Sequence, residues 1–414
     1  MLFVFFLSIE WDSMPSLPDT LDRVKDAVFV GNVIIAGVEK KVANTHYSGI
    51  IYLDTLEGVW HNPDTSYSFE KENMITRLYY DEQSHRVFAL VVYVFSDPRT
   101  NTYVYYSDDT GKVWHSVLIS SGSLTRIFDI KRLSDGKLYL VGGRVFSLSD
   151  RYGAIYYSDD NGLSWDLWKK TNTGESGELA FILEKEEGVI WTADRGGYNS
   201  FLYEDTLGRT GDLIKRSRLG NIPGLPGFYN MIKTDSGYLA SGVKGNRESR
   251  LWYYDEEKDE WNEIFEADGY NLRWAQLYTT DKLLIWAKYY NDAFVYYSED
   301  CGFTYTIDSS FQAHKEIRMI KALNDERVLL TASYPPGIYI SKKQQDVIEK
   351  EKIESGDVLR SKFINSYGRI EVCDVNGRIV YQGEDKTIKL GVGVYFVKYV
   401  QNNKEVVKKL VIVR

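Results

Sequence analysis

Cysteine, proline and histidine are scarce in this chain, and each scarcity excludes a class of protein. Cys301 and Cys373 are the only cysteines, and their wide separation excludes a disulfide framework and a zinc site built on Cys-x-x-Cys pairs. We expect each to be a buried thiol. The five histidines show no Ser-His-Asp arrangement, and no phosphate-binding loop is visible. The sequence therefore predicts no cofactor and no metal site, and no catalytic residue can be assigned.

A net positive charge is also missing. The chain has 50 basic and 59 acidic residues, a formal net charge of −9, which argues against a general nucleic-acid-binding protein. The apolar run from Met1 to Ser8 is shorter than a membrane span, so we expect no transmembrane span. No basic residue precedes this run and no cleavage site is obvious, so it is either a signal-peptide remnant or an ordinary strand.

Aromatic residues, by contrast, are abundant. The chain holds 32 Tyr, 18 Phe and 10 Trp but only 8 Pro, a composition typical of a sheet-rich protein. Its 414 residues are too many for one small domain, so we expect a large repeat domain and a smaller one.

A pattern of eight residues, S-x-D-x-G-x-x-[WY], occurs three times, each time after an apolar residue and two tyrosines. The tyrosine run predicts a strand. The Ser and Asp side chains can bond to nearby backbone N–H groups and close a turn, and the Gly adopts a backbone conformation that a Cβ would resist. The residues with these roles are Ser107, Asp109, Gly111 and Trp114; Ser158, Asp160, Gly162 and Trp165; and Ser298, Asp300, Gly302 and Tyr305.

This pattern resembles the Asp-box, or BNR repeat, of sialidases, sortilin-type receptors and related β-propellers. The resemblance implies a sialidase-like propeller fold, in which these residues are structural. It marks a fold and not an activity.

Weaker copies extend the repeat to seven units of roughly 40 to 50 residues, the length of one propeller blade. The residues before the turn in successive units are Leu53, Tyr106, Tyr157, Tyr203, Tyr254, Tyr297 and Ile340. We therefore predict an all-β fold, a seven-bladed β-propeller with four strands in each blade. The seventh unit has no such turn, so its outer strand must come from residues 345–353 or from the N-terminal run at 2–10.

The last residues follow another pattern. Alternating strands separated by Asn376-Gly377 and other glycine turns predict a small antiparallel β-sandwich. The segment resembles the sorting domain of the type IX secretion system through a D-x-x-G-R hairpin ending at Arg378, a G-x-Y-F-V strand beginning at Gly393, and the final basic residue Arg414. The resemblance implies a partner in the outer-membrane secretion machinery and a secreted or bacterial cell-surface protein. A generic β-sandwich remains the alternative.

Four segments are expected from these patterns. They are residues 1–22, a signal remnant or closing strand; 23–343, the propeller; 344–357, a charged linker or last outer strand; and 358–414, the sorting-domain-like β-sandwich.

Arginines recur where the innermost strand of a unit is expected to begin. They are Arg23, Arg77, Arg126, Arg273 and Arg318, while Glu178 and Asn230 stand near this position in the fourth and fifth units. Inner strands begin at the face opposite the Asp-box turns, so five guanidinium groups would surround one funnel. Arginine suits carboxylate and phosphate, which predicts a site for an acidic glycan, a carboxylate ligand or an acidic protein partner. The alternative, that each arginine pairs with a neighbouring acid, stays open.

Tyrosines in the loops at the same face could stack on sugar rings. They are Tyr47, Tyr152, Tyr198, Tyr289, Tyr290 and Tyr334. In a chain so rich in tyrosine, their presence there can equally be incidental.

A non-catalytic binding propeller is therefore our main functional hypothesis. The sialidase elements Arg-Ile-Pro and an assignable Tyr-Glu nucleophile pair are absent, although a glycoside hydrolase of sialidase-like type remains an alternative. A structural or assembly protein of a cell-surface layer is another, because the fold does not settle function.

Overall fold

The structure is a computed structural model. It describes residues 11–341 except 44, 64–69, 72, 94–100, 121–125, 146–150, 172–177, 195–200, 219–225, 235–236, 245–247, 257, 259, 271–277, 281–282, 288–293, 299–305, 309–310, 312–313, 315 and 324–326, and it also describes 359–360, 370–374, 378–383, 387–388, 393–401 and 404–412.

Every regular element in these ranges is a β-strand, which confirms the predicted all-β class. The strands belong to two compact units, one with β1 to β29 and the other with β30 to β35. No helix that could cross a membrane occurs in the described part of the chain.

Five sheets of the larger unit each pair four strands antiparallel in chain order. They are β7 (Asn73–Asp81), β8 (Arg86–Tyr93), β9 (Thr102–Ser107) and β10 (His115–Ser120); β11 (Arg126–Arg132), β12 (Leu138–Val145), β13 (Arg151–Ser158) and β14 (Asp166–Lys170); β15 (Leu179–Glu186), β16 (Val189–Asp194), β17 (Phe201–Thr206) and β18 (Ile214–Arg218); β19 (Pro226–Thr234), β20 (Gly237–Lys244), β21 (Glu248–Asp255) and β22 (Glu260–Tyr270); and β23 (Tyr278–Thr280), β24 (Leu283–Ala287), β25 (Val295–Ser298) and β26 (Thr306–Asp308).

A nine-stranded sheet contains two further sets of four strands. The first is β2 (Arg23–Val30), β3 (Val33–Val42), β4 (Thr45–Asp54) and β5 (Val59–His61), with β6 (Glu70–Lys71) also beside β4; the second is β27 (Glu316–Ala322), β28 (Val328–Ser333), β29 (Gly337–Ser341) and β1 (Trp11–Ser13). One residue pair, Arg23 with Ser333, joins the two sets.

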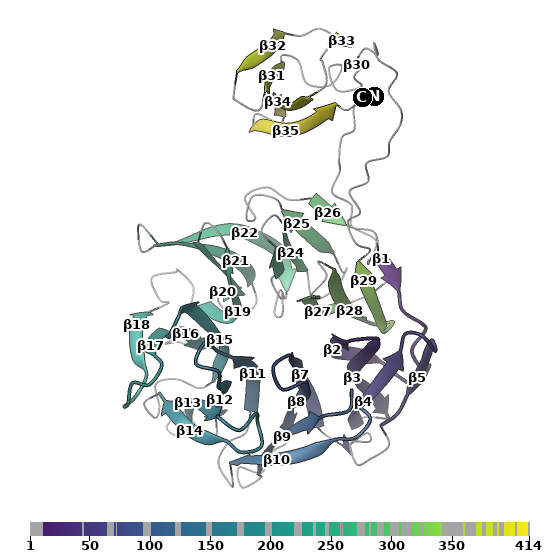
Figure 1. The fold of residues 1–414 in the computed structure, drawn as a ribbon, viewed down its shortest axis with the longest axis vertical. Coiled ribbons are helices and arrows are strands. Elements are labelled where there is room, and N and C mark those ends of the chain that lie inside the picture. Colours follow the sequence, from purple (N-terminus) through teal and green to yellow (C-terminus); the bar gives the residue numbers. More distant parts are fainter. Residues whose placement is uncertain are drawn as a thin grey trace. The chain divides into compact units, whose positions relative to one another are not determined.

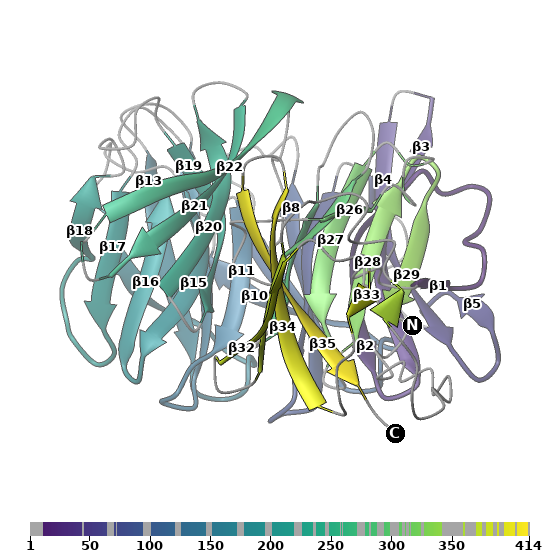
Figure 2. The same cartoon turned by 90° about the horizontal axis from the view of Figure 1, so that it is seen from above.

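The sheets of this unit stand around a ring, with β2, β7, β11, β15, β19 and β27 toward its inside (Figure 1). Figure 2 shows them edge-on, their strands running between the two faces of the ring. This arrangement of four-stranded antiparallel sheets is like that of propeller blades.

The strand that closes the ring comes from the N-terminal part of the chain. Strand β1 pairs antiparallel with β29, Trp11 lying opposite Ser341 and Ser13 opposite Tyr339. The two segments proposed from sequence for this place, 2–10 and 345–353, lie outside the described residues.

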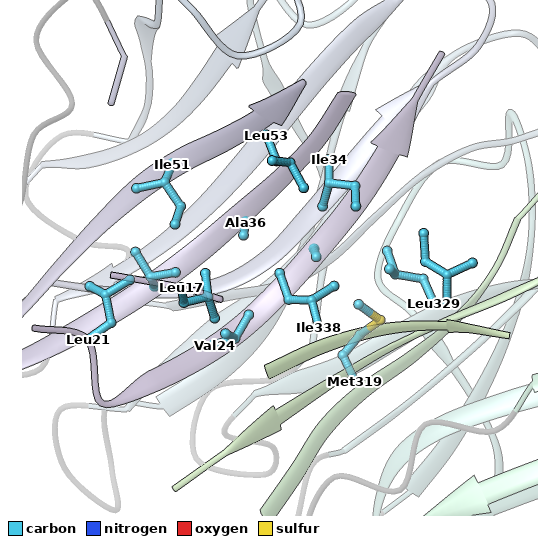
Figure 3. Packing of buried hydrophobic residues seen from close by; sticks show 13 residues of the cluster. Leu17, Leu21, Val24, Ile34, Ala36, Ile51, Leu53, Met319, Leu329 and Ile338 are labelled. Carbon is cyan, nitrogen blue, oxygen red and sulfur yellow. The ribbon is translucent and has the colours of Figure 1, made fainter. Parts of the chain in front are cut away.

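The core of the larger unit lies between and within neighbouring sheets. One cluster contains Val24 and Ile34 from the beginning of this unit's sequence together with Met319 and Leu329 from its end (Figure 3). All six residues of β28 are buried, because Leu329 packs into one hydrophobic cluster and Leu330 into another. Apolar side chains on both faces thus bind each sheet to its neighbours.

The turn between β9 and β10 has a closed set of hydrogen bonds. The Ser107 hydroxyl donates to Asp109 Oδ1 (2.8 Å) and accepts from the N–H of Gly111 (2.9 Å), and Asp109 Oδ1 also accepts from the N–H of Val113 (2.8 Å). The Trp114 ring N–H donates to the carbonyl of Gly111 (2.9 Å). These bonds satisfy the polar groups that the tight turn would otherwise leave unpaired.

The turn between β13 and β14 repeats this set. Ser158 donates to Asp160 (2.7 Å) and accepts from Gly162 N–H (2.7 Å), and the Trp165 ring N–H donates to the carbonyl of Gly162 (3.2 Å). A Cβ added to Gly162 would lie 2.5 Å from Phe88 of the preceding sheet. The turn therefore also packs against its neighbour. In the third copy Ser298 is buried at the end of β25, and Asp300, Gly302 and Tyr305 lie outside the described residues.

The smaller unit contains two antiparallel sheets. One has the order β32 (Ile379–Gly383), β31 (Ile370–Asp374), β34 (Gly393–Gln401) and β35 (Lys404–Ile412), and the other pairs β30 (Leu359–Arg360) with β33 (Thr387–Ile388).

Candidate anion-binding site at the start of the inner strands

The structure gives the predicted arginines different places on their strands. Arg23 and Arg126 begin β2 and β11 and stand just before the position where the register of each strand shifts by one residue. Arg77 follows that shift in β7, and Arg318 lies within it in β27. Of the four arginines that the structure describes, Arg23 and Arg126 are therefore the two that are equivalent in register. Arg273 lies outside the described residues.

Each of the four described arginines lies beside a carboxylate. The pairs are Arg23–Glu39 (3.0 Å), Arg77–Asp129 (3.1 Å), Arg126–Glu178 (3.2 Å) and Arg318–Glu316. These four contacts are of the kind described by the alternative raised from the sequence, in which each arginine pairs with a neighbouring acid. What distinguishes one position from another is the number of further groups that gather there.

Glu39 is the centre of the densest group. Its Oε2 lies 3.0 Å from Arg23 Nη1 and 2.8 Å from Lys25 Nζ, and its Oε1 lies 3.1 Å from His46 Nδ1. The residue is only 4% exposed. Burial alone would raise the pKa of Glu39, but Lys25 and Arg23 outweigh it and hold the pKa below its usual value. Glu39 is thus a buried, ionised anchor for cations.

Lys25 connects this group to strands β7 and β27. Its side chain is largely buried, and its Nζ lies 3.7 Å from the sulfur of Met74 on β7. Burial, with a smaller contribution from Arg318, lowers the pKa of Lys25 to about 8, although Glu39 opposes the change. Arg318 and its partner Glu316 therefore belong to the same electrostatic cluster.

Tyr334 completes the cluster. It follows β28, and its ring centre lies 4.8 Å from the guanidinium carbon of Arg23, a cation–π contact. Ser333 pairs with Arg23 on one side and with Glu316 on the other, which brings these side chains to one end of the sheet. Burial raises the pKa of Tyr334, with Arg23 opposing and Glu316 adding to the rise. The phenol consequently stays protonated near neutral pH.

The cluster carries an excess of positive charge. Three cations, Arg23, Lys25 and Arg318, face two carboxylates, Glu39 and Glu316. One positive charge remains when His46 is neutral. The side chain of Arg23 is 24% exposed, so solvent and ligands reach it. The arrangement can hold an anionic group against a fixed guanidinium and an aromatic ring.

Sequence reasoning missed Glu39, Glu316 and Lys25. An unbroken antiparallel register from the turn after Val30 would place Arg23 opposite Lys40, but the one-residue shift in β2 brings it opposite Glu39. The pairing of β2 with β3 could have been counted from the turn after Val30. No pattern in the sequence marks the β-bulge that shifts this pairing by one residue.

Of the predicted tyrosines, only Tyr334 is in this cluster. Tyr47 and Tyr152 lie on β4 and β13, and Tyr198, Tyr289 and Tyr290 lie outside the described residues. No group of three or more potential metal ligands occurs among the described residues.

Comparison with known proteins supports the fold alone. No family model and no curated protein matches the sequence. A crystal structure of the polysaccharide lyase Uly1 is similar with a TM-score of 0.50 at 11% identity, covering 82% of this chain and 92% of that one. The acylaminoacyl peptidase of Pyrococcus horikoshii has a TM-score of 0.47 at 11% identity, covering 91% of this chain and 58% of that one. The first likeness fits the all-β, propeller-like architecture.

Proposed function

We propose that this chain is a non-catalytic binding protein that holds an acidic carbohydrate, or another carboxylate-bearing ligand, at the cluster of Arg23, Lys25, Glu39, Tyr334 and Arg318. We further propose that the ring is a seven-bladed propeller of the Asp-box type. The matching hydrogen bonds of the turns at Ser107 and Ser158 support the second proposal.

The observation that carries the binding proposal is the mounting of Arg23. Glu39 Oε2 accepts a hydrogen bond from the guanidinium, and the ring centre of Tyr334 lies 4.8 Å from the guanidinium carbon, so two neighbours hold the side chain before a ligand arrives. A preorganised arginine loses little rotamer freedom on binding. Its exposed donors can pair with a carboxylate, while the Tyr334 ring offers an apolar surface to a sugar.

Binding fits the two glutamates better than hydrolysis does. A glycosidase acid must be protonated at working pH, which requires a raised pKa. Glu39 has a lowered pKa because Lys25 and Arg23 contact it, and Glu316 is paired with Arg318. Glu39 is therefore unsuited to donating a proton to a leaving group.

Titration calorimetry with polyuronate and sialylated oligosaccharides tests the binding proposal. We expect Arg23→Gln to weaken binding about 10-fold to 100-fold, the effect of losing one charge-assisted contact. Arg86→Gln is the matched control, because Arg86 is also paired with a carboxylate, Asp108 at 2.6 Å, and stacked at 4.8 Å over Tyr106. Equal affinities of wild type and Arg23→Gln for every acidic ligand would refute the proposal.

The same ligands distinguish a hydrolase. Fluorogenic sialosides and uronides should show no turnover above the uncatalysed rate. Turnover that Glu39→Gln or Glu316→Gln abolishes would instead establish the glycoside hydrolase alternative.

We also propose that the protein is secreted or displayed on a bacterial surface through its C-terminal unit. The sequence around the β31–β32 hairpin and strand β34 carries the D-x-x-G-R and G-x-Y-F-V patterns that support this. In a bacterium with type IX secretion, a reporter fused to residues 358–414 should reach the surface or the medium. Retention of the fusion in the periplasm would contradict the proposal.

A further inference from the structure

A cavity of about 510 Å³ lies between β2, β7 and the β27–β28 hairpin. Val28 and Phe29 line it near the end of β2, whereas Arg23 begins that strand. The cavity is therefore separated along β2 from the Glu39 cluster. Its volume is within the range of small-molecule sites.

Lys321 forms a fixed part of the cavity wall. Its Nζ donates to Asp26 Oδ1 (2.6 Å), to the carbonyl of Leu78 (2.7 Å) and to the carbonyl of Ala27 (3.2 Å). All three ammonium hydrogens are thus used, and they tie β27 to β2 and β7. Lys321 contributes charge to the cavity but has no donor left for a ligand.

Arg77 is the wall residue that retains donors. Its Nε lies 3.1 Å from Asp129 Oδ1, and its side chain is 21% exposed. Asp129 is itself held by the N–H groups of Ile130 (3.0 Å) and Ile182 (3.1 Å). No acceptor other than Asp129 contacts the Arg77 guanidinium among the described residues. Its terminal N–H groups can therefore meet a ligand.

Cations outnumber carboxylates among the residues that line the cavity. Arg77, Lys321 and Arg327 line it, with Glu82 as the acidic residue of the lining. Arg77 and Lys321 are in contact with Asp129 and Asp26, which are not themselves lining residues. The exposed donors of Arg77 therefore favour an anionic group at this wall.

The rest of the lining suits a ring. Phe29, Tyr79 and Tyr80 are aromatic, and Leu323 and Leu329 are aliphatic. The phenol oxygen of Tyr79 already accepts from the backbone N–H of Arg132 (3.2 Å), which fixes that ring. Apolar and aromatic walls with a small number of polar or charged groups are typical of sites for small ligands.

We propose that this cavity is a second binding site, which takes a small monoanion whose carboxylate sits on an apolar ring. The carboxylate pairs with the terminal N–H groups of Arg77, and the ring lies against Phe29, Tyr79 and Tyr80. The site goes beyond the proposed carbohydrate function and does not depend on it.

Calorimetry with 4-bromobenzoate, as a test probe, measures the charge requirement. We expect Arg77→Gln to weaken binding about 10-fold or more, and the neutral 4-bromobenzamide to bind wild type about 10-fold more weakly than the acid. Arg23→Gln should bind 4-bromobenzoate as wild type does, although it loses the acidic carbohydrate. Equal affinity for acid and amide, or a loss caused by Arg23→Gln alone, would overturn the proposal.

A wild-type crystal grown with 4-bromobenzoate locates the probe without any variant. Anomalous scattering should place the bromine in the cavity beside Arg77, which settles the question even if Arg77→Gln does not fold. Bromine at the Glu39 cluster, or an empty cavity in crystals grown at a saturating concentration of 4-bromobenzoate, would refute the proposal. Neither outcome decides the carbohydrate proposal, which is tested separately by the calorimetry with acidic oligosaccharides.

Discussion

Substitution of Gly162 tests most directly how the turn between β13 and β14 packs against the preceding sheet, which contains β8. The Gly162 φ of +86° lies in the left-handed region, and a Cβ there would lie 2.5 Å from Cε1 and 2.7 Å from Cζ of Phe88. Phe88 is fully buried and packs in the same cluster as Trp165. The substitution Gly162→Ala therefore disturbs both the backbone and the interface between two sheets.

The two effects can be separated with Gly136. Gly136 has a similar φ of +80°, but nothing lies within 4 Å of an added Cβ. Gly136→Ala should therefore lower the free energy of unfolding by only the backbone term, about 1–2 kcal/mol. Gly162→Ala adds overpacking against Phe88, a further 1–3 kcal/mol or so, for a total of roughly 2–5 kcal/mol.

Equilibrium denaturation by urea, followed by circular dichroism, measures both values. The double variant Gly162→Ala/Phe88→Leu should be more stable than the sum of its single changes implies, because the smaller side chain leaves room for the methyl group. Agreement of Gly162→Ala with Gly136→Ala to within about 0.5 kcal/mol would show that the turn does not press on Phe88, and the reasoning would fail.

Three further predictions concern buried polar groups. Lys25 and Lys321 have pKa values of about 8 in the folded protein against 10.5 ordinarily. Unfolding therefore takes up protons between these values, and the free energy of unfolding should rise from about pH 8 to about pH 10.5. Urea titrations that give a flat or falling profile over this range would contradict this. Ser158→Ala removes two hydrogen bonds of its turn and should lower the unfolding free energy by about 1–2 kcal/mol, visible as a lower midpoint of thermal denaturation. Lys169→Met leaves the buried Asp205 without one of its cations and should lower the free energy of unfolding, measured in urea, by about 3 kcal/mol. A decrease of less than about 1 kcal/mol would mean that Arg209 alone neutralises Asp205.

The strands and turns of the ring could be predicted because their signals are local. The apolar runs beginning at Val33, Val87 and Val328 are strands of the structure, and the tyrosine runs before Ser107 and Ser158 end in tight turns. Each signal depends on a few adjacent residues, the alternation of a strand or the hydrogen-bonding capacity of Ser and Asp. The all-β class with four-stranded sheets followed from these.

The candidate site could be predicted only in outline. Arg23 was found because it begins an apolar strand, but its partner Glu39 depends on a bulge, and Tyr334 reaches it through the pairing of Arg23 with Ser333. Contacts across such sequence distances leave no signal in the adjacent residues. The bonds between Asp129 and Ile182, and between Lys321 and Leu78, were missed for the same reason.

The pairing of β1 with β29 has a consequence for synthesis of the protein on the ribosome. Trp11 pairs with Ser341, which at about 5–20 residues per second is synthesised about 17–66 s later. Leu17 and Leu21 pack in a cluster with Met319 and Leu329, so until then these early leucines lack part of their cover. A chain that ends before residue 341 would lack the partner strand of β1 and part of the cover of Leu17 and Leu21.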